Sequence, residues 1–297
     1  MHQLSILILT FNSSKYIKPC LDSVFSQNFE DFEVIVVDGG SKDGTISFIK
    51  ENYPQVVLIE NIENIGAAEA RNQGIKIAKS EWILTLDCDI HLEKDFLCKM
   101  TSFIKKLDIN IGSFQPKILN FDKKTIYSTG IYLSRIRRFF DIGKGQSDNG
   151  NFNRLRFIFG ACSAAAFYKR EMLEQINEKS GYFDKRFFFL IEDVDLSWRA
   201  QRKGWKALYY PEAHCYHSGD SSNTSQKIRQ YLCFRNRYYT IIKNDSFKNM
   251  LINCFLSFPY DAFRFFHLLF SNPYTLKAFR EIFQFLINET EYYSSGK

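Results

Sequence analysis

The chain has 297 residues, of which 45% are apolar and 24% are charged, and its formal net charge is +6. This composition includes no low-complexity tract, which argues against a disordered chain, and the length allows one large core or two smaller ones. The seven cysteines are scattered and never spaced as CxxC, which argues against a disulfide scaffold and favours a reducing compartment.

The first 110 residues alternate between patterns typical of strands and of helices. Short apolar runs predict strands over residues 4–9, 32–37, 56–59 and 82–86. Helical patterns follow these runs over about 14–27, from 45, over 67–79 and over 94–106. Such alternation predicts an α/β fold with a mostly parallel sheet and right-handed crossovers.

Beyond residue 110 the pattern becomes mixed. Strand patterns cover 113–119, 125–133 and 206–210, and helical patterns cover 192–203 and 225–243. The stretch 136–156 is rich in Arg, Gly and Asn, which predicts a mobile loop. Residues 1–4 show no signal-peptide pattern and no apolar run approaches about 18 residues, so we expect a cytoplasmic protein without a spanning helix.

Two acidic residues follow the apolar run over 82–86. Because side chains alternate along a strand, we expect Asp87 and Asp89 on the same side at its carboxyl end. Ligands of open α/β sheets bind at that edge, and two carboxylates there suit a hard divalent cation with a phosphorylated ligand. His217 is a further candidate ligand, which would favour Mn²⁺. The alternative is a solvated turn after a strand.

A second acidic cluster, Glu192-Asp193-Val194-Asp195, opens the helix predicted over 192–203. Acidic residues at this position can simply complement the positive end of the helix dipole. The apolar run 187–191 directly before them favours a second interpretation, in which the cluster supplies a general base to a dry active site.

Two glycine-containing turns are candidate donor contacts. Asp38 opens a turn after the second strand, where it could contact a nucleoside or simply shape the turn. Small residues after Gly66 begin a helix, so a diphosphate could approach its amino end and Arg71 could reach the phosphate. Alternatively, these small residues pack on the sheet. Neither turn carries a GxGxxG or GxxxxGK[ST] motif, which argues against a Rossmann dinucleotide site and a P-loop.

Taken as a set, these motifs resemble the family 2 glycosyltransferases, which share the GT-A fold of nucleotide-diphospho-sugar transferases. The matching segments are Thr10–Asn12, Val37–Thr45, Asn64–Gly66, Ala70–Asn72, Asp87–Asp89 and Glu192–Leu196. Segments at 181–184, 198–199, 204–205 and 211–217 resemble the bacterial rhamnosyltransferase-type branch. The resemblance covers about residues 4–240 in consistent order.

The resemblance implies a role for each candidate residue. It implies that the nucleotide-sugar donor is bound by Thr10, Asn12, Asp38, Gly66, Arg71 and Asp87. It assigns a divalent cation, Mn²⁺ or Mg²⁺, to the DxD motif of Asp87 and Asp89 with His217. Asp193 would be the general base, with Glu192 and Trp198 on the acceptor side.

These roles imply an inverting glycosyltransferase that moves a sugar to a saccharide hydroxyl, such as that of a lipid-linked glycan or a cell-surface polysaccharide precursor. The catalytic domain would cover 1–243, with a nucleotide-binding half over about 1–110 and an acceptor-binding half over about 111–243. A sugar-phosphate nucleotidyltransferase is disfavoured, because residues 10–15 lack the glycine- and basic-rich loop of that class. A non-catalytic carbohydrate- or membrane-binding protein on the same fold is the alternative from another class.

Residues 244–297 are predicted to form an aromatic and basic helical extension. Residues 225–297 hold ten Lys and Arg, five Asp and Glu, and 18 of the 49 aromatic residues. The aromatic residues lie among aliphatic ones, so we expect a membrane surface rather than nucleic acid as partner. Pro259, Asp261 and Arg264 interrupt the apolar run, which predicts peripheral attachment at the cytoplasmic face. Alternatively, these helices pack on the catalytic domain or form a homodimer.

Overall fold

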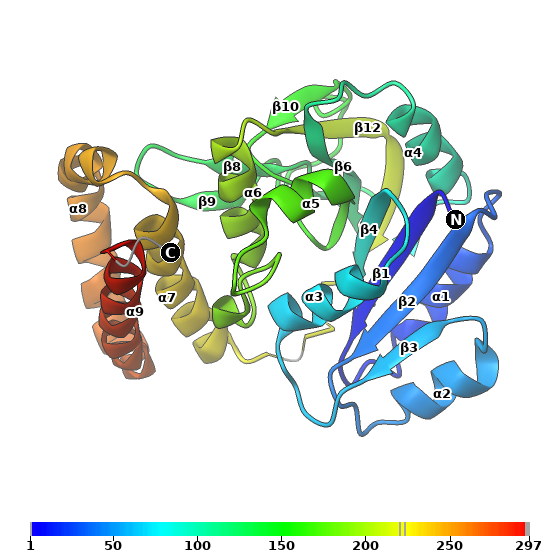
Figure 1. The fold of residues 1–297 in the computed structure, drawn as a ribbon, viewed down its shortest axis with the longest axis horizontal. Coiled ribbons are helices and arrows are strands. Elements are labelled where there is room, and N and C mark those ends of the chain that lie inside the picture. The colour runs from blue at the N-terminus through cyan, green and yellow to red at the C-terminus, as the bar shows by residue number, and fades with distance from the viewer. Residues whose placement is uncertain (1, 220, 223, 295–297) are drawn as a thin grey trace.

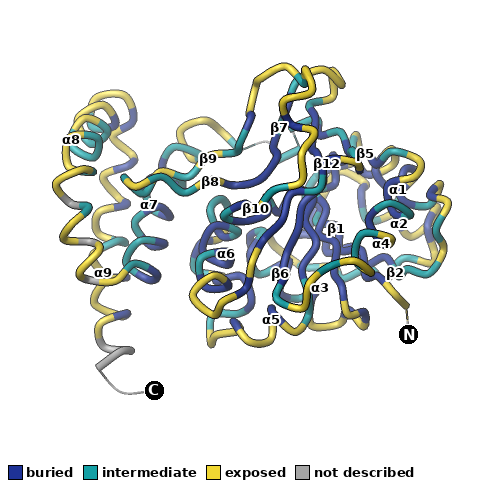
Figure 2. The backbone as a smooth tube through the Cα atoms, turned by 90° about the horizontal axis from the view of Figure 1, so that it is seen from above, coloured by how far each residue is buried: buried dark blue, intermediate teal, exposed yellow. Residues whose placement is uncertain are grey.

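A mixed ten-stranded sheet forms the centre of the computed structural model, which describes residues 2–219, 221–222 and 224–294 (Figure 1). Its strand order is β10-β12-β6-β11-β4-β1-β2-β3, with β5 paired to β12 and β7 paired to β6. A second sheet has two strands, β8 and β9. Helices cover both faces of the large sheet, and α7, α8 and α9 form a separate layer at one end (Figure 1, Figure 2).

The N-terminal half is a parallel α/β unit, as the sequence predicts. Its strands are β1 (Leu4–Thr10), β2 (Phe32–Asp38), β3 (Val57–Glu60) and β4 (Trp82–Asp87), which all pair in parallel. Its helices are α1 (Ile17–Phe25), α2 (Thr45–Asn52), α3 (Ala67–Ile77) and α4 (Phe96–Ile104). The predicted strands and helices of this half are therefore confirmed, with their ends moved by a few residues.

Side chains of β1 alternate between two cores, because helices cover both faces of the sheet. Ile6 packs in one core with Leu21 of α1, whereas Leu7 packs in the other with Ile75 of α3. Helix α3 lies close to the sheet, since a Cβ atom at Gly74 would come within 2.1 Å of Leu7 Cδ1. This packing fixes the amino end of α3 beside the carboxyl ends of β1 and β4.

The chain after β4 adds strands that pair mostly antiparallel. These strands are β5 (Ile90–Leu92), β6 (Ile111–Asn120), β7 (Ile126–Ser128), β10 (Arg156–Ile158), β11 (Ala165–Lys169) and β12 (Lys206–His217). Strand β11 pairs antiparallel with both β4 and β6, whereas β12 runs parallel to β6. The mostly parallel order predicted from the sequence thus holds for β1 to β4 and gives way to mixed pairing beyond them.

A two-stranded ribbon stands where the sequence predicts one strand and a loop. Strand β8 (Ile131–Leu133) pairs with β9 (Phe139–Asp141), which lies inside the stretch 136–156. The strand predicted over 125–133 is divided between β7 and β8, because Gly130 lies between them with φ of 121°. The prediction of a loop throughout 136–156 is therefore wrong at β9.

A buried lysine orders the later part of the same stretch. Lys117 of β6 is buried, and its ammonium group donates to Asp148 Oδ2 at 2.8 Å and to Asn153 Oδ1 at 2.5 Å. A buried charge is stable only when it is paired in this way, so the contact fixes the chain around both partners. The composition of 136–156 alone could not reveal this anchor.

The remaining helices complete one face of the sheet and build the layer at its end. They are α5 (Arg170–Ile176), α6 (Glu192–Arg202), α7 (Gln226–Asn244), α8 (Phe247–Ser271) and α9 (Leu276–Ser294). Helix α7 packs against α6 on one side and against α9 on the other. The predicted helical extension is thus present, and its boundary at residue 243 stays a prediction. Within the described residues, no helix combines the length and the apolar character needed to cross a membrane.

Candidate active site

A cavity of about 630 Å³ opens at the carboxyl ends of β1 and β4. Its walls come from the turn after β1, the start of α3, the ribbon β8–β9, the segment before α6 and the residues after β12. Seven of the predicted residues line it: Thr10, Gly66, Arg71, Asp87, Glu192, Asp193 and His217. The cavity thus lies at the sheet edge that the sequence indicates.

Asp87, Asp89 and His217 come together where β4 and β12 end. Asp87 is the last residue of β4, and the turn that holds Asp89 leads into β5, which pairs with the end of β12. His217 Nε2 therefore lies 3.0 Å from Asp89 Oδ1 and 3.9 Å from Asp87 Oδ2. One ligand atom from each residue lies within 4.8 Å of the others. The three residues proposed as metal ligands from the sequence form one group.

The charges of this group suit a divalent cation. Asp89 is buried and also accepts a hydrogen bond from the Gly219 N–H at 2.9 Å. Burial alone would raise the pKa of Asp89, but His217 lowers it below the ordinary value. Burial raises the pKa of Asp87 above its ordinary value, against the opposing charges of Arg71 and His217. Two carboxylates and an imidazole fit Mn²⁺ or Mg²⁺, and a cation would offset the burial of Asp87.

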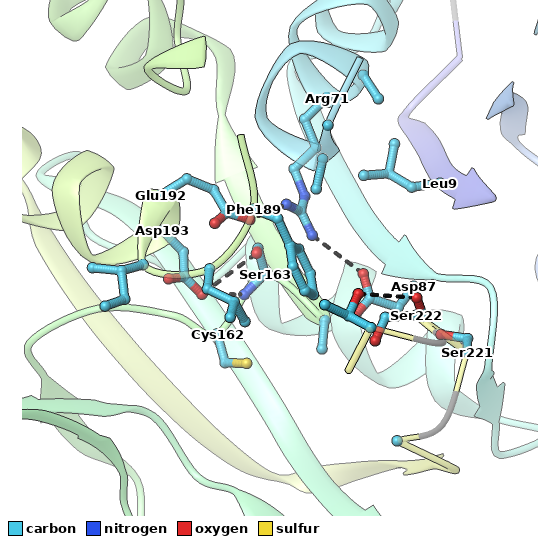
Figure 3. Close-up of a pocket in the computed structure, with 18 of the residues that line it drawn as sticks. Leu9, Arg71, Asp87, Cys162, Ser163, Phe189, Glu192, Asp193, Ser221 and Ser222 are labelled. Carbon is cyan, nitrogen blue, oxygen red and sulfur yellow. Dashed lines mark hydrogen bonds and ion pairs between the residues drawn. The ribbon is translucent and has the colours of Figure 1, made fainter. Parts of the chain in front are cut away.

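Arg71 connects the two acidic clusters. It is buried in α3, and its Nη1 donates to Glu192 Oε1 at 2.6 Å while its Nη2 donates to Asp87 Oδ1 at 3.2 Å. Burial would lower the pKa of Arg71, but Glu192 and Asp87 raise it above the ordinary value. The guanidinium group therefore stays charged on the cavity wall (Figure 3). Glu192, expected on the acceptor side, is buried and paired with this arginine.

Asp193 lies in the first turn of α6 and lines the cavity. Its Oδ2 accepts a hydrogen bond from the Ser163 N–H at 3.1 Å (Figure 3). Burial and the charge of Glu192 raise the pKa of Asp193 from 3.8 to about 7. A cavity-facing carboxyl with a pKa near neutrality has the properties required of a general base.

Asp195, two residues further along α6, has a different environment. Its Oδ2 accepts from Arg199 Nε at 2.9 Å and from Lys243 Nζ at 3.1 Å, and its Oδ1 accepts from Asn244 Nδ2 at 2.8 Å. Burial would raise the pKa of Asp195, but Arg199 and Lys243 lower it below the ordinary value. Asp195 is therefore a structural ion that ties α6 to α7.

Asn12 and Asp38 hold the turns beside the cavity. The Ser41 N–H donates to Asp38 Oδ1 at 2.7 Å, and Ser41 Oγ donates to Asp38 Oδ2 at 2.6 Å. Asn12 Oδ1 accepts from the Lys42 N–H at 2.8 Å. Thr10 faces the cavity, and its buried Oγ1 has no hydrogen-bond partner among the described residues. The nucleoside contacts of these residues stay predictions.

Trp198 lies on α6 outside the residues that line the cavity. Its ring meets the Phe159 ring edge-on with centroids 6.1 Å apart, and the Arg137 guanidinium lies 5.4 Å from it. Arg137 belongs to the turn between β8 and β9. Trp198 thus supports the ribbon wall of the cavity from behind, and its role on the acceptor side stays a prediction.

Several cavity-lining residues are not found by the sequence reasoning. Ser163 holds Asp193, Tyr127 lies edge-on against His217 with ring centroids 4.1 Å apart, and Lys144 and Arg229 add positive charge to the wall. Strand pairing and the placement of α7 bring these residues to the cavity from distant parts of the chain. The basic character of 136–156 and 225–243 is the sequence signal that points to the last two.

Comparisons with known proteins agree with this architecture. The family model described as glycosyl transferase family 2 matches residues 5–176. Poly-β-1,6-N-acetyl-D-glucosamine synthase of Staphylococcus aureus is 27% identical over 218 residues, which are 72% of this chain and 49% of that protein. Poly(ribitol-phosphate) β-glucosyltransferase of Bacillus spizizenii is 38% identical over 121 residues, which are 38% of this chain and 19% of that protein. The chain spans about half the length of the first of these relatives.

Solved structures show the same fold. A mannosyltransferase from Pyrobaculum calidifontis in complex with GDP-Man and Mn²⁺ is 18% identical, with a TM-score of 0.58 over 94% of this chain and 73% of that chain. TarS of Staphylococcus aureus in complex with UDP-GlcNAc is 18% identical, with a TM-score of 0.53 over 83% of this chain and 68% of that chain. The predicted GT-A fold is confirmed.

Proposed function

Because the chain belongs to glycosyl transferase family 2, we propose that it moves a sugar from a nucleotide-diphosphate sugar to a hydroxyl group of a saccharide acceptor. One observation carries the proposal: a single cavity brings the group of Asp87, Asp89 and His217 together with Asp193. The group of Asp87, Asp89 and His217 suits the diphosphate of a donor, and Asp193 suits the hydroxyl of an acceptor.

Cationic groups of this cavity would bind the donor diphosphate. Asp87, Asp89 and His217 would hold Mn²⁺ or Mg²⁺, which when bound acts as a Lewis acid on the leaving diphosphate. Arg71 lies on the same wall with a fixed positive charge, and Arg229 lines the cavity from α7. The nucleoside would lie toward the turn after β1, where Thr10 Oγ1 is unpartnered among the described residues.

Asp193 would remove the proton from the acceptor hydroxyl as that oxygen attacks the anomeric carbon. The new glycosidic bond forms while the bond to the diphosphate breaks, so a single displacement inverts the anomeric configuration. A pKa of about 7 places Asp193 between the two protonation states at neutral pH, where general-base catalysis works best. The Ser163 N–H fixes the carboxylate during this step.

The donor and the acceptor follow from the chain's resemblances. The segments over 181–217 resemble those of the rhamnosyltransferase-type branch, so a hexose or a deoxyhexose is our candidate for the transferred sugar. The names of two relatives, a poly-N-acetylglucosamine synthase and a poly(ribitol-phosphate) glucosyltransferase, support a cell-surface polymer or its lipid-linked precursor as acceptor.

The outer helices support attachment to the cytoplasmic face of a membrane. Much of helix α8 is exposed (Figure 2). Phe255, Phe263 and Phe270 on this helix are exposed at 86%, 74% and 83% of their surfaces. The acidic groups of α8 and α9 whose side chains are described pair inward: Asp261 with Arg237, Glu281 with Arg235 and Glu289 with Arg186. Lys248, Lys277 and Arg280 are exposed, and each contributes about 1 kcal/mol near an anionic lipid surface.

Flotation with anionic liposomes tests the attachment. We expect the protein to float at low salt, and a double variant Phe255→Ser with Phe263→Ser to remain at the bottom of the gradient. Phe121→Ser is the matched control, because Phe121 is 59% exposed on the turn between β6 and β7. If the wild type does not float but self-associates in sedimentation, the exposed phenylalanines of α8 form a homodimer contact instead.

A donor panel tests the transferase activity itself. UDP-, dTDP- and GDP-sugars are incubated with Mn²⁺ or Mg²⁺, and the release of nucleotide diphosphate is measured for the wild type and for Asp193→Asn. We expect release from at least one donor by the wild type alone. Binding of donors without any turnover would favour a non-catalytic carbohydrate-binding protein on this fold.

A further inference from the structure

The segment that leads into α6 has an unusual backbone. Phe188, Leu190 and Ile191 have φ angles of 65°, 69° and 72°, a region that bulky and β-branched residues rarely adopt. Residues 188–191 all line the cavity, and Asp193 lies two residues after Ile191. Such conformations persist only where neighbouring groups hold them, so the holding groups matter for the site.

Helix α7 supplies these groups. The buried Asn236 Nδ2 lies 3.0 Å from the carbonyl oxygen of Phe187, 2.9 Å from that of Phe189 and 2.7 Å from that of Leu190. Arg235 Nη2 donates to the Phe187 carbonyl at 2.9 Å, and Arg235 Nε donates to Asn236 Oδ1 at 2.9 Å. The second contact fixes which way the amide of Asn236 points.

The same segment also touches the donor side of the cavity. The Phe188 carbonyl accepts a hydrogen bond from the Ala68 N–H at 3.2 Å, at the amino end of α3. A Cβ atom at Gly66 would come within 2.5 Å of Phe188, so the two walls lie in tight contact. A shift of the segment would therefore move Asp193 relative to the donor site.

We propose that Asn236 is a positioning residue, which holds the segment 187–191 so that Asp193 faces the reacting atoms in a shielded cavity. The inference rests on the proposed function, in which Asp193 is the general base. Asn236 is fully buried and is not among the described residues that line the cavity, so it acts through the segment. Helix α9 also contributes to holding the segment, because Glu281 on α9 accepts a hydrogen bond at 3.0 Å from Nη1 of Arg235, the residue that orients Asn236.

The first readout is turnover of Asn236→Ala and of Thr240→Ala. Thr240 lies one turn further along α7, is also buried, and donates within its own helix to the Asn236 carbonyl at 2.9 Å. We expect Asn236→Ala to lower kcat roughly 10²-fold with little change in the donor KM, which is the scale of a small misplacement of a reacting group. Thr240→Ala should retain the wild-type kcat. Arg235→Gln should lower kcat in the same direction, and it decides the matter if Asn236→Ala does not fold.

The second readout does not need turnover. It is the pKa of the Asp193 carboxyl in ligand-free protein, measured by carbon NMR and assigned with Asp193→Asn. The charged groups that face Asp193 are Glu192 on α6, Arg71 on α3 and Asp141 on β9, and burial is the main cause of its raised pKa.

Water should reach Asp193 when the segment loosens, so its pKa should fall by about one unit or more in Asn236→Ala and stay unchanged in Thr240→Ala. An Asn236→Ala protein with the wild-type kcat and the wild-type Asp193 pKa, but a lower melting temperature, would overturn the proposal. If the wild type releases no nucleotide from any donor, the proposed function fails, and the NMR comparison still decides whether Asn236 positions Asp193.

Discussion

Asp87 of the first acidic cluster and Asp193 of the second lie on opposite sides of one cavity, but the chain holds the two clusters by different means (Figure 3). Asp87 and Asp89 follow a strand that is fixed between β1 and β11, and strand pairing also brings His217 to them. Asp193 follows a segment that depends on contacts to Asn236, which lies 46 to 49 positions further along the chain. The proposed cation site therefore depends on the sheet, whereas the proposed base depends on the C-terminal helices.

Asp89→Asn should have the largest effect on activity. A neutral amide replaces an anionic oxygen ligand, so we expect loss of divalent-dependent turnover together with weaker donor binding. Nucleotide release and donor calorimetry, each with and without Mn²⁺, measure the two effects. Full wild-type activity in excess chelator would remove the cation from the reaction.

Asp193→Asn should separate binding from turnover. The amide is nearly isosteric, so donor affinity should survive while kcat falls by roughly 10²–10⁴-fold, the usual share of general-base catalysis. Steady-state kinetics and donor calorimetry on the same protein give both quantities. Normal turnover would move the base away from this cluster, because Glu192 is paired with Arg71 and Asp195 with Arg199 and Lys243.

Lys243→Met tests the dependence of the second cluster on α7. The ammonium group of Lys243 lies 2.8 Å from Asp184 Oδ2 and 3.1 Å from Asp195 Oδ2, and all three residues are buried. Removing one partner of a buried ion pair costs about 3 kcal/mol or more of unfolding free energy, measured by urea titration.

Lys18→Met is the matched control for that substitution. Lys18 and Asp22 form a shorter ion pair at 2.6 Å, but their side chains are 60% and 52% exposed. An exposed pair contributes less than about 1 kcal/mol. Equal losses in Lys243→Met and Lys18→Met would show that the network behind α6 does not stabilise it.

The pH dependence of stability should distinguish Asp193 from a solvated carboxyl. Its pKa is raised from 3.8 to about 7 in the folded protein, so the stability it contributes is present below the lower value and lost as the pH rises through the upper one. We expect Asp193→Asn to melt at a higher temperature than the wild type, by a margin that grows from about pH 5 to about pH 8. A constant difference across this range would show that the Asp193 carboxyl titrates normally.

The same contrast explains what the sequence reveals about this protein. Alternating apolar runs predict β1 to β4, and side-chain alternation places Asp87 at a ligand-binding edge, because these features depend on local patterns. The sequence analysis also predicts that Asp87, Asp89 and His217 form one group, and the structure brings these three residues together. The division of 125–133, strand β9 and the anchor at Lys117 depend on contacts between distant residues, which no local pattern contains.

The second cluster shows where sequence reasoning stops. The sequence does not distinguish the environments of the three acidic residues in this cluster. In the structure, Glu192 pairs with Arg71 and Asp195 pairs with Lys243, whereas Asp193 lines the cavity with a raised pKa. The partners of Glu192 and Asp195 come from α3 and α7, and Ser163, the partner of Asp193, lies 30 positions before it in the chain. The contacts of Asn236 with carbonyl groups within residues 187–190 likewise become visible only when α7 is placed beside the segment before α6.

The anomeric configuration of the product tests the proposed single displacement most directly. In the proposed function the cation would stabilise the leaving diphosphate while Asp193 would activate the attacking hydroxyl, so the reaction is expected to be a single displacement. Proton NMR of the transferred sugar, followed from the start of the reaction with the identified donor, reads the configuration from the coupling of the anomeric proton. A single displacement gives a configuration opposite to that of the donor, and a retained configuration would contradict the proposed role of Asp193.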